Sequence, residues 1–307
     1  MSLTGNQILH TLAYFDIFRY PLTGDEINMY HGGMAGETQI AENLDELVRT
    51  KQVFTNGSFY GLYKNPLLFE RRLKGNQHAN ELLPLARKVG RFLYHFPFVR
   101  AVGISGSLSK QFAEPDADLD FFIITATGRV WVARTLLHLL KKISFLFGRQ
   151  HWFCMNYFIA GSAPVIEEKN IFTATEIVTL IPVCGKKFFA DFFAANAWVN
   201  TYYPKINLSA NLVPVEDKPD GFLKKTTEKI LSGKAGDRLD DYWLKLTSKR
   251  WADKEKNRVN KKGFPMGLKA EKQAARPRPE YFQQKILDAY AKRTALLQTG
   301  TPMACTG

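Results

Sequence analysis

Two acidic residues, Asp118 and Asp120, stand two positions apart and follow a Gly106-Ser107 pair after a ten-residue spacer. Side chains two apart on a strand point to the same face, so both carboxylates are expected on one side, with Leu119 on the other. Glycine allows a ligand to approach the backbone closely. Two convergent carboxylates beside such a turn suit Mg²⁺, which takes few protein oxygens and completes its shell with water and phosphate. The spacing predicts a magnesium site with Asp118 and Asp120 as ligands.

The residues that follow the glycine predict a place for phosphate. Residues 107–112 are expected to open a short helix, whose free N–H groups and positive dipole end attract a phosphate. Ser107, with the backbone of Gly106, is the candidate for binding it. Lys110 lies one turn into this segment, within reach of a phosphate, and an exposed helical lysine is the alternative interpretation.

This pattern resembles the signature of the DNA polymerase β-like nucleotidyltransferase superfamily. That signature is an apolar residue, a glycine, a glycine or serine, a spacer of about a dozen residues, and then Asp-apolar-Asp. The matching segments here are Ser105-Gly106-Ser107 and Asp118-Leu119-Asp120. The resemblance implies a mixed sheet, a divalent metal and a nucleoside triphosphate substrate. In that superfamily the paired carboxylates bind the metal and are catalytic, and a third carboxylate on a neighbouring strand completes the site.

The expected third carboxylate is missing from the strand that should supply it. Residues 152–159 form an apolar run whose mid-strand polar residue is Asn156. An amide oxygen can accept one metal bond, but a neutral amide cannot act as a base. We therefore take Asn156 as a third metal ligand. Alternation along the strand then predicts that Cys154 and Phe158 lie on the cleft side, with Asn156. The residues predicted to be buried against helices on the other side are Phe153, Met155 and Tyr157.

Three glutamates further along the chain are weaker substitutes for that carboxylate. Glu167 and Glu168 follow Pro164 in an expected loop, and Glu176 lies in an expected helix. Three alternatives stay open: the site works with two carboxylates, the base lies elsewhere, or the chain binds nucleotide without turning it over.

The first 65 residues predict three helices and a hairpin, an arrangement that resembles a winged helix. Thr23 and Glu26 form a capping box before the second helix, and Asn56-Gly57 is a hairpin turn. The third helix, near residues 38–50, is rich in acidic residues. Because such a helix repels nucleic-acid phosphates, packing or protein docking is the favoured role.

Periodicity predicts the remaining elements. Residues 67–95 read as one long helix that Pro84 should kink or split, and residues 254–279 read as a loop. A linker is expected over residues 204–220. Further helices are expected over residues 129–147, 172–182, 187–203, 222–249 and 281–297.

Composition limits the class of protein. The net charge is +13, and from Lys224 onward 20 Lys and Arg stand against 9 Asp and Glu, an excess of 11 that leaves +2 for the rest. An anionic partner would therefore meet mainly the C-terminal region. Three dispersed cysteines indicate a reducing compartment, and without an eighteen-residue apolar run no membrane partner is expected. The six histidines show no metal spacing, and each is expected to be a surface or partly buried imidazole.

Together these patterns predict an α+β fold with a nucleotidyltransferase-type mixed sheet and flanking helices. We divide the chain into a winged-helix-like module (1–65), a catalytic core (66–204) and a basic helical C-terminal region (205–307). The predicted protein is a cytoplasmic, Mg²⁺-dependent enzyme that moves a nucleoside monophosphate from a nucleoside triphosphate to a hydroxyl of an unidentified acceptor, for example a protein or RNA. The alternatives are a weakly active or inactive nucleotide-binding scaffold and a nucleic-acid-binding regulator. The oligomeric state does not follow from the sequence.

Overall fold

The N-terminal part of the chain forms a small helical unit closed by a hairpin. The structure is a computed structural model and describes residues 2–213, 215, 219–257, 268–276 and 280–299. Ser2 accepts the first helical hydrogen bond from Gly5 N, and the predicted Thr23–Glu26 capping box is present. The three expected helices and the hairpin are confirmed as α1 (Leu3–Asp16), α2 (Gly24–Tyr30), α3 (Glu37–Arg49), β1 (Phe54–Thr55) and β2 (Tyr60–Gly61).

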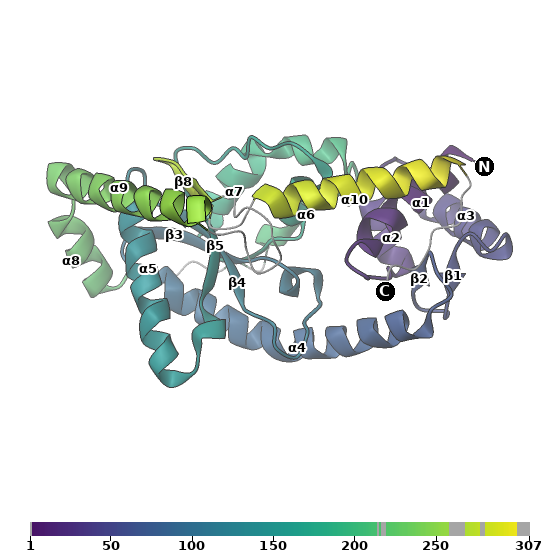
Figure 1. Ribbon diagram of the computed structural model, residues 1–307, viewed down its shortest axis with the longest axis horizontal. Coiled ribbons are helices and arrows are strands. Elements are labelled where there is room, and N and C mark those ends of the chain that lie inside the picture. The colour runs from purple at the N-terminus through teal and green to yellow at the C-terminus, as the bar shows by residue number, and fades with distance from the viewer. Residues whose placement is uncertain (1, 214, 216–218, 258–267, 277–279, 300–307) are drawn as a thin grey trace.

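A long helix, α4 (Pro66–Tyr94), connects this unit to the sheet (Figure 1). Pro66 occupies its first turn, where the missing N–H costs nothing, and Asn65 caps Leu67 N. Pro84 does not split the helix, contrary to one expected outcome. The turns that follow Pro84 bury Val89 and Leu93 in the core beside the sheet, and this packing maintains the helix past the proline.

The centre of the molecule is a mixed sheet of six strands in the order β6-β3-β4-β5-β8-β7. Strand β4 pairs in parallel with β5, and the crossover between them contains α5 (Val130–Ser144). The other described pairs are antiparallel. The strands are β3 (Val99–Ile104), β4 (Asp120–Thr125), β5 (Cys154–Ala160), β6 (Ile181–Cys184), β7 (Lys269–Ala270) and β8 (Ala274–Arg276). The chain is therefore a mixed α+β protein.

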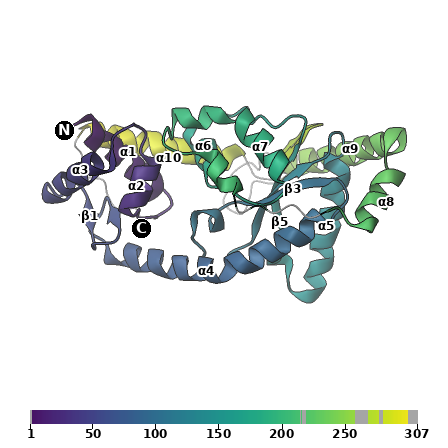
Figure 2. The same cartoon turned by 180° about the vertical axis from the view of Figure 1, so that it is seen from behind.

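Helices cover both faces of this sheet (Figure 2). On one face Phe121 and Phe158 pack with residues of α4 and α5, including the fully buried Trp131. On the other face Phe122 and Ile159 pack with residues of α6 (Ile171–Val178) and α7 (Lys186–Ala195). The alternation of apolar side chains along β4 therefore supplies two cores at once.

The expected helix over residues 172–182 is wrong in its last turn. Helix α6 ends at Val178, and β6 pairs with β3 instead. Pro182 is compatible with β6 because this strand lies at an edge of the described sheet. Proline has no N–H to donate, and edge strands tolerate this because they have a neighbouring strand on one side only. The expected helix over residues 187–203 is α7 followed by the 3₁₀ helix η4 (Ala197–Thr201).

The C-terminal region is helical but also extends the sheet. Helices α8 (Phe222–Ile230), α9 (Gly233–Asn257) and α10 (Glu280–Thr299) are present. The expected loop over residues 254–279 is wrong in its described part, because it contains β7 and β8, and β8 pairs with β5. The boundaries at residues 65 and 204 stay predictions. In the described parts of the chain, no helix has the length and apolar character needed to cross a bilayer.

Helix α10 returns to the N-terminal unit (Figure 1). Its Ile286 is buried in the core of that unit. The ring of Tyr290 meets the ring of Tyr14 edge-on with centroids 5.6 Å apart, and Arg293 Nε lies 2.9 Å from Asp16 Oδ2. Residues from the two ends of the sequence therefore stabilise one core.

A buried ion pair also joins the N-terminal unit to α4. Arg72 is 2% exposed, its Nη2 lies 2.6 Å from Glu26 Oε1, and its guanidinium stacks 3.8 Å from the centroid of the Tyr20 ring. We expect Glu26→Gln to lower the free energy of unfolding by about 3 kcal/mol, because it leaves a buried charge unpaired. The matched control Glu46→Gln removes the exposed partner of Arg49 and should cost no more than about 0.5 kcal/mol. Urea unfolding measures both; equal losses would contradict the prediction.

Candidate active site in the β3–β4 cleft

The site begins with a glycine turn at the end of β3. Ser105 N donates to Asp120 O over 2.9 Å, and Gly106 follows with φ +71°. A Cβ built on Gly106 would lie 2.2 Å from Asp120 Oδ2, well inside van der Waals contact. The Asp120 carboxylate therefore lies against the backbone at a position with no room for a side chain, as the spacing of the motif predicts.

The segment after the glycine is shorter than expected. The predicted helix over residues 107–112 is wrong: η1 is a three-residue 3₁₀ turn, Leu108–Lys110, and Gln111 has φ 54°. Such a turn has no sizeable dipole, so the predicted helix-end phosphate site is absent from this segment. Ser107 is exposed at the start of the turn, beside Gly106.

Lys110 points back under this turn. Its Nζ donates to Gly106 O over 3.0 Å and pairs with Glu176 Oε1 at 2.8 Å. Both side chains are largely removed from solvent, with 17% and 26% exposed. Glu176 comes from α6, so this ion pair joins the glycine turn to the opposite wall of the cleft. Of the three glutamates considered from the sequence, Glu176 is the one nearest this turn by contact.

The two predicted metal carboxylates have different neighbours. Leu119 between them is buried at 2% exposure, which agrees with the predicted alternation. Asp120 contacts Gly106 and Asn156, whereas Asp118 Oδ1 lies 2.6 Å from His151 Nδ1. His151 was expected to be an ordinary imidazole. The sequence signal that could have identified His151 is its position just before β5. Because β5 pairs in parallel with β4, the residues that precede the two strands lie side by side, and His151 meets Asp118.

Asn156 lies on a β-bulge. Phe121 is opposite Met155 and Phe122 is opposite Tyr157, so Asn156 is an extra residue in β5. Its Nδ2 donates a short hydrogen bond to Asp120 Oδ1. The structure thus brings Asn156 to Asp120, but it is the amide N–H that meets the carboxylate, and the amide oxygen accepts from Cys154. The role of Asn156 as a third metal ligand stays a prediction.

The bulge corrects the predicted faces of β5. Phe158, expected on the cleft side, is 1% exposed and packs in the core with residues of α4 and α5. Tyr157, expected on the opposite face, stacks on Phe122 with ring centroids 5.2 Å apart and lines the cleft. One inserted residue shifts the alternation by one position, which explains both errors. Phe153 and Met155 are buried as predicted.

Cys154 lies at the rim of the site. Its Sγ donates to Asn156 Oδ1 over 3.2 Å. Burial raises the pKa of this thiol to about 11, and the negative charge of Asp120 adds to the effect. The thiol is therefore neutral near pH 7 and does not compete with the carboxylates for a cation.

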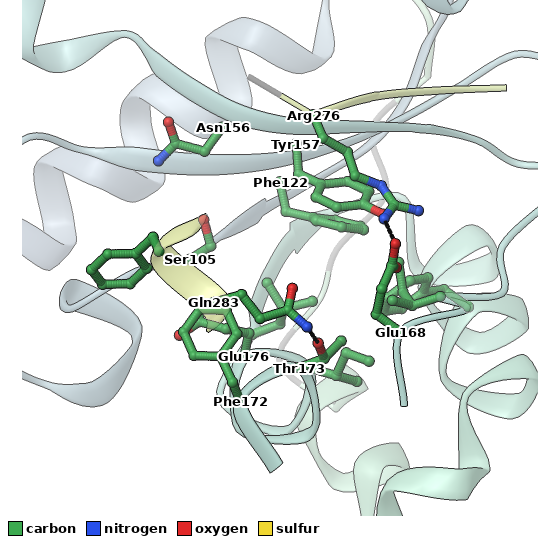
Figure 3. Close-up of a pocket in the computed structure, with 15 residues that line it drawn as sticks. Ser105, Phe122, Asn156, Tyr157, Glu168, Phe172, Thr173, Glu176, Arg276 and Gln283 are labelled. Carbon is green, nitrogen blue, oxygen red and sulfur yellow. Dashed lines mark hydrogen bonds and ion pairs between the residues drawn. The ribbon is translucent and has the colours of Figure 1, made fainter. Parts of the chain in front are cut away.

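Two cavities that share lining residues form the cleft, and Figure 3 shows one of them, the aromatic cavity. The glycine-turn cavity contains Gly106, Ser107, Lys110, Asp120 and Glu176. The aromatic cavity contains Ser105, Asn156, the stacked Phe122 and Tyr157, and the ion pair of Glu168 with Arg276. Phe172, Glu176 and Phe282 line both cavities. Both cavities open to solvent, so a ligand could reach the residues that line them from outside.

The donor set suits a cation that keeps most of its water. Among the described residues, no group of three or more His, Cys, Asp and Glu is placed to hold a metal ion. Glu168 pairs with Arg276, Glu176 pairs with Lys110 and Glu167 is exposed. What remains is two carboxylates and one amide, which fits Mg²⁺ because this ion uses one or two carboxylates together with water and phosphate oxygens.

Comparison of the chain with protein families, with curated proteins and with solved structures finds no match. The chemistry of the cleft therefore has to follow from its own residues.

A methyl group at Gly106 tests the close approach of Asp120. We expect Gly106→Ala to lose more stability than Gly57→Ala. Both glycines have positive φ, which costs an alanine about 1–2 kcal/mol, but a Cβ on Gly57 meets nothing within 4 Å. Gly106→Ala must in addition displace the Asp120 carboxylate. Urea unfolding of both variants measures the difference in the free energy of unfolding. If Gly106→Ala loses no more stability than Gly57→Ala, the Asp120 carboxylate does not need the close approach to Gly106.

Proposed function

We propose that the chain is a Mg²⁺-dependent nucleotidyltransferase that transfers a nucleoside monophosphate from a nucleoside triphosphate to a hydroxyl group. The observation that carries the proposal is the contact of Asp120 with the Gly106 turn, with Asn156 on the other side of the same carboxylate. A bound divalent cation would neutralise phosphate charge and make the acceptor hydroxyl more acidic.

Each residue of the cleft has a role in this proposal. Asp120 and Asp118 hold the cation, and the bulged Asn156 orients Asp120 through its hydrogen bond. Ser107 and the backbone of Gly106 bind phosphate oxygens from the open side of the turn. Lys110, fixed by Glu176, contributes positive charge beneath them without extending into solvent.

The aromatic cavity suits the nucleoside end of the same substrate. Phe172 and Phe282 meet edge-on with centroids 5.9 Å apart, at the junction of the two cavities. Tyr157, stacked on Phe122, forms a further aromatic surface. Flat rings next to a phosphate-binding turn favour a nucleobase, because stacking accepts any base and needs few polar partners.

A second candidate is a protein that binds nucleotide without turning it over. The observation that favours it is again Asn156, which occupies the place expected for a third carboxylate and presents an N–H donor to Asp120. A neutral amide cannot take the proton of an acceptor hydroxyl. Assays of binding and of pyrophosphate release in parallel distinguish the two candidates.

Removing the two carboxylates should abolish nucleotide binding. We expect the double variant Asp118→Asn, Asp120→Asn to weaken Mg²⁺-dependent binding of nucleoside triphosphates by more than about a hundredfold, because even outer partners of a metal are worth 10–100-fold. The control is Asp116→Asn, which removes an exposed carboxylate from the same connection. Isothermal titration measures affinity, and a cooperative unfolding transition verifies the fold. Unchanged affinity in the double variant would refute the metal assignment.

Restoring a carboxylate at the bulge should tighten metal binding. Without Mg²⁺, we expect Asn156→Asp to lower the melting temperature, because two carboxylates then face each other. Added Mg²⁺ should recover more stability in this variant than in the unchanged protein, and pyrophosphate release should rise if transfer occurs. Asn156→Ala, which removes the amide without adding charge, is the control. A fall in Mg²⁺ affinity on Asn156→Asp would contradict the assignment.

A further inference from the structure

A third cavity, the basic cavity, opens between α5 and β5 next to the proposed active site. One wall carries Arg134, His138 and Lys141 from α5, and the other carries Cys154 and Asn156 from β5, with Met155 and Phe158 completing it. Asn156 also lines the aromatic cavity, and its amide contacts Asp120. A ligand in the basic cavity would therefore lie one side chain away from Asp120.

The charge of this cavity has one sign. The three α5 residues follow the spacing i, i+4 and i+7, which places them on the same face of the helix. In the part of the chain that the structure describes, no carboxylate lines the cavity. The sequence from residue 121 to residue 166 contains no Asp or Glu and five basic residues, which are Arg129, Arg134, Lys141, Lys142 and Arg149.

Arg134 is held by aromatic rings and has no carboxylate partner among the described residues. Its guanidinium lies 4.7 Å from the centroid of the Trp251 ring and 5.6 Å from that of Trp131. Its Nε is buried and has no hydrogen-bond partner among the described residues, which likewise offer it no ion pair. Burial lowers the pKa of Arg134 to about 10. A buried donor without an acceptor is costly, so a charge kept at this position indicates an anionic ligand.

The nucleotide does not account for this cavity. The residues assigned to its phosphates, Gly106, Ser107 and Lys110, line the glycine-turn cavity and do not line the basic cavity. The aromatic residues assigned to the nucleobase, Phe172 and Phe282, are likewise absent from it. The remaining reactant of a transfer reaction is the acceptor.

We infer that the basic cavity binds an anionic group of the acceptor, a phosphate or a group of similar charge and shape, and so places its hydroxyl beside Asp120. The guanidinium fork of Arg134 matches phosphate oxygens, and the ammonium of Lys141 adds a second charge-assisted hydrogen bond. The identification of the ligand as the acceptor rests on the proposed function. The existence of an anion site does not depend on that function.

Sulfate is a suitable probe because its charge does not change near neutral pH. We expect sulfate to bind the full chain, and Lys141→Met to weaken it by about tenfold, the worth of one charge-assisted hydrogen bond. The matched control is Lys142→Met, which removes the same charge from the next residue of α5, an exposed side chain that does not line the cavity. Arg134→Lys keeps the positive charge but loses the two parallel N–H donors of the guanidinium, so it should also weaken sulfate binding. The lysine side chain still fills the space between Trp131 and Trp251.

The pKa of His138 reports directly on anion binding, because it would not change if Arg134 and Lys141 had only a structural role. Burial lowers its pKa to about 4, and the neighbouring cations Arg134, Lys142 and Lys141 on α5 and Lys254 on α9 add to the effect. An anion among these groups favours the protonated imidazole. Its titration midpoint, followed by NMR, should therefore rise when sulfate is added.

The outcomes separate this inference from the proposed function. The double variant Asp118→Asn, Asp120→Asn should lose Mg²⁺-dependent nucleotide binding yet keep sulfate affinity, or increase it, since two nearby negative charges are removed. Absence of sulfate binding, or equal losses in Lys141→Met and Lys142→Met, would overturn the anion site and leave the nucleotide assignment standing. Sulfate binding in a chain that binds no nucleotide would confirm the anion site and overturn its assignment to an acceptor.

Discussion

The close contact between the Asp120 carboxylate and the Gly106 turn determines the rest of the cleft. It depends on the antiparallel pairing of β3 with β4, because Ser105 N donates to Asp120 O and so aligns the end of one strand with the start of the next. A side chain at Gly106 would push the carboxylate away. Every other polar group of the site, from Asn156 to the Lys110–Glu176 pair, is arranged around this one approach.

The charges of the cleft are balanced in pairs that connect separate elements. Lys110 with Glu176 joins the turn to α6, and Glu168 with Arg276 joins the loop before α6 to β8. Low solvent exposure strengthens such pairs only when both partners are present. Two ion pairs therefore connect the walls of the cleft, whereas the described residues that line the cavity beside α5 include Arg134 and Lys141 but no carboxylate. This contrast between neighbouring cavities is the main reason for assigning them different ligands.

The parts of the structure that depend on local pattern could be predicted from the sequence. The apolar spacing predicts α1 to α5, the Thr23–Glu26 box predicts the start of α2, and the motif spacing predicts that Asp120 meets the Gly106 turn. The parts set by partners distant in sequence could not. Strands β6 and β8 are short and form through main-chain pairing, which leaves little trace in side-chain pattern.

The errors in β5 and at His151 both come from features of strand pairing that a single strand's sequence does not specify. An inserted residue in a strand has no signature in a sequence of apolar side chains, so the bulge at Asn156 shifted every predicted face beyond it. The role of His151 depends on the register between β4 and β5, which alternation along one strand does not specify. Sequence reasoning thus found the acidic residues but not the neighbours that orient them.

Helix α10 links α1 to the wall of the cleft, and Tyr14 of α1 also lines the glycine-turn cavity together with Phe282 of α10. A straight helix of its 20 residues is about 30 Å long. Near its start Phe282 and Gln283 form a wall of the aromatic cavity, and further along the helix Tyr290 and Arg293 contact α1. Because a helix transmits displacement along its axis with little bending, a tilt of the N-terminal unit would move the wall of the cavity with it. The first helix of the chain is thereby mechanically coupled to the volume available to a ligand.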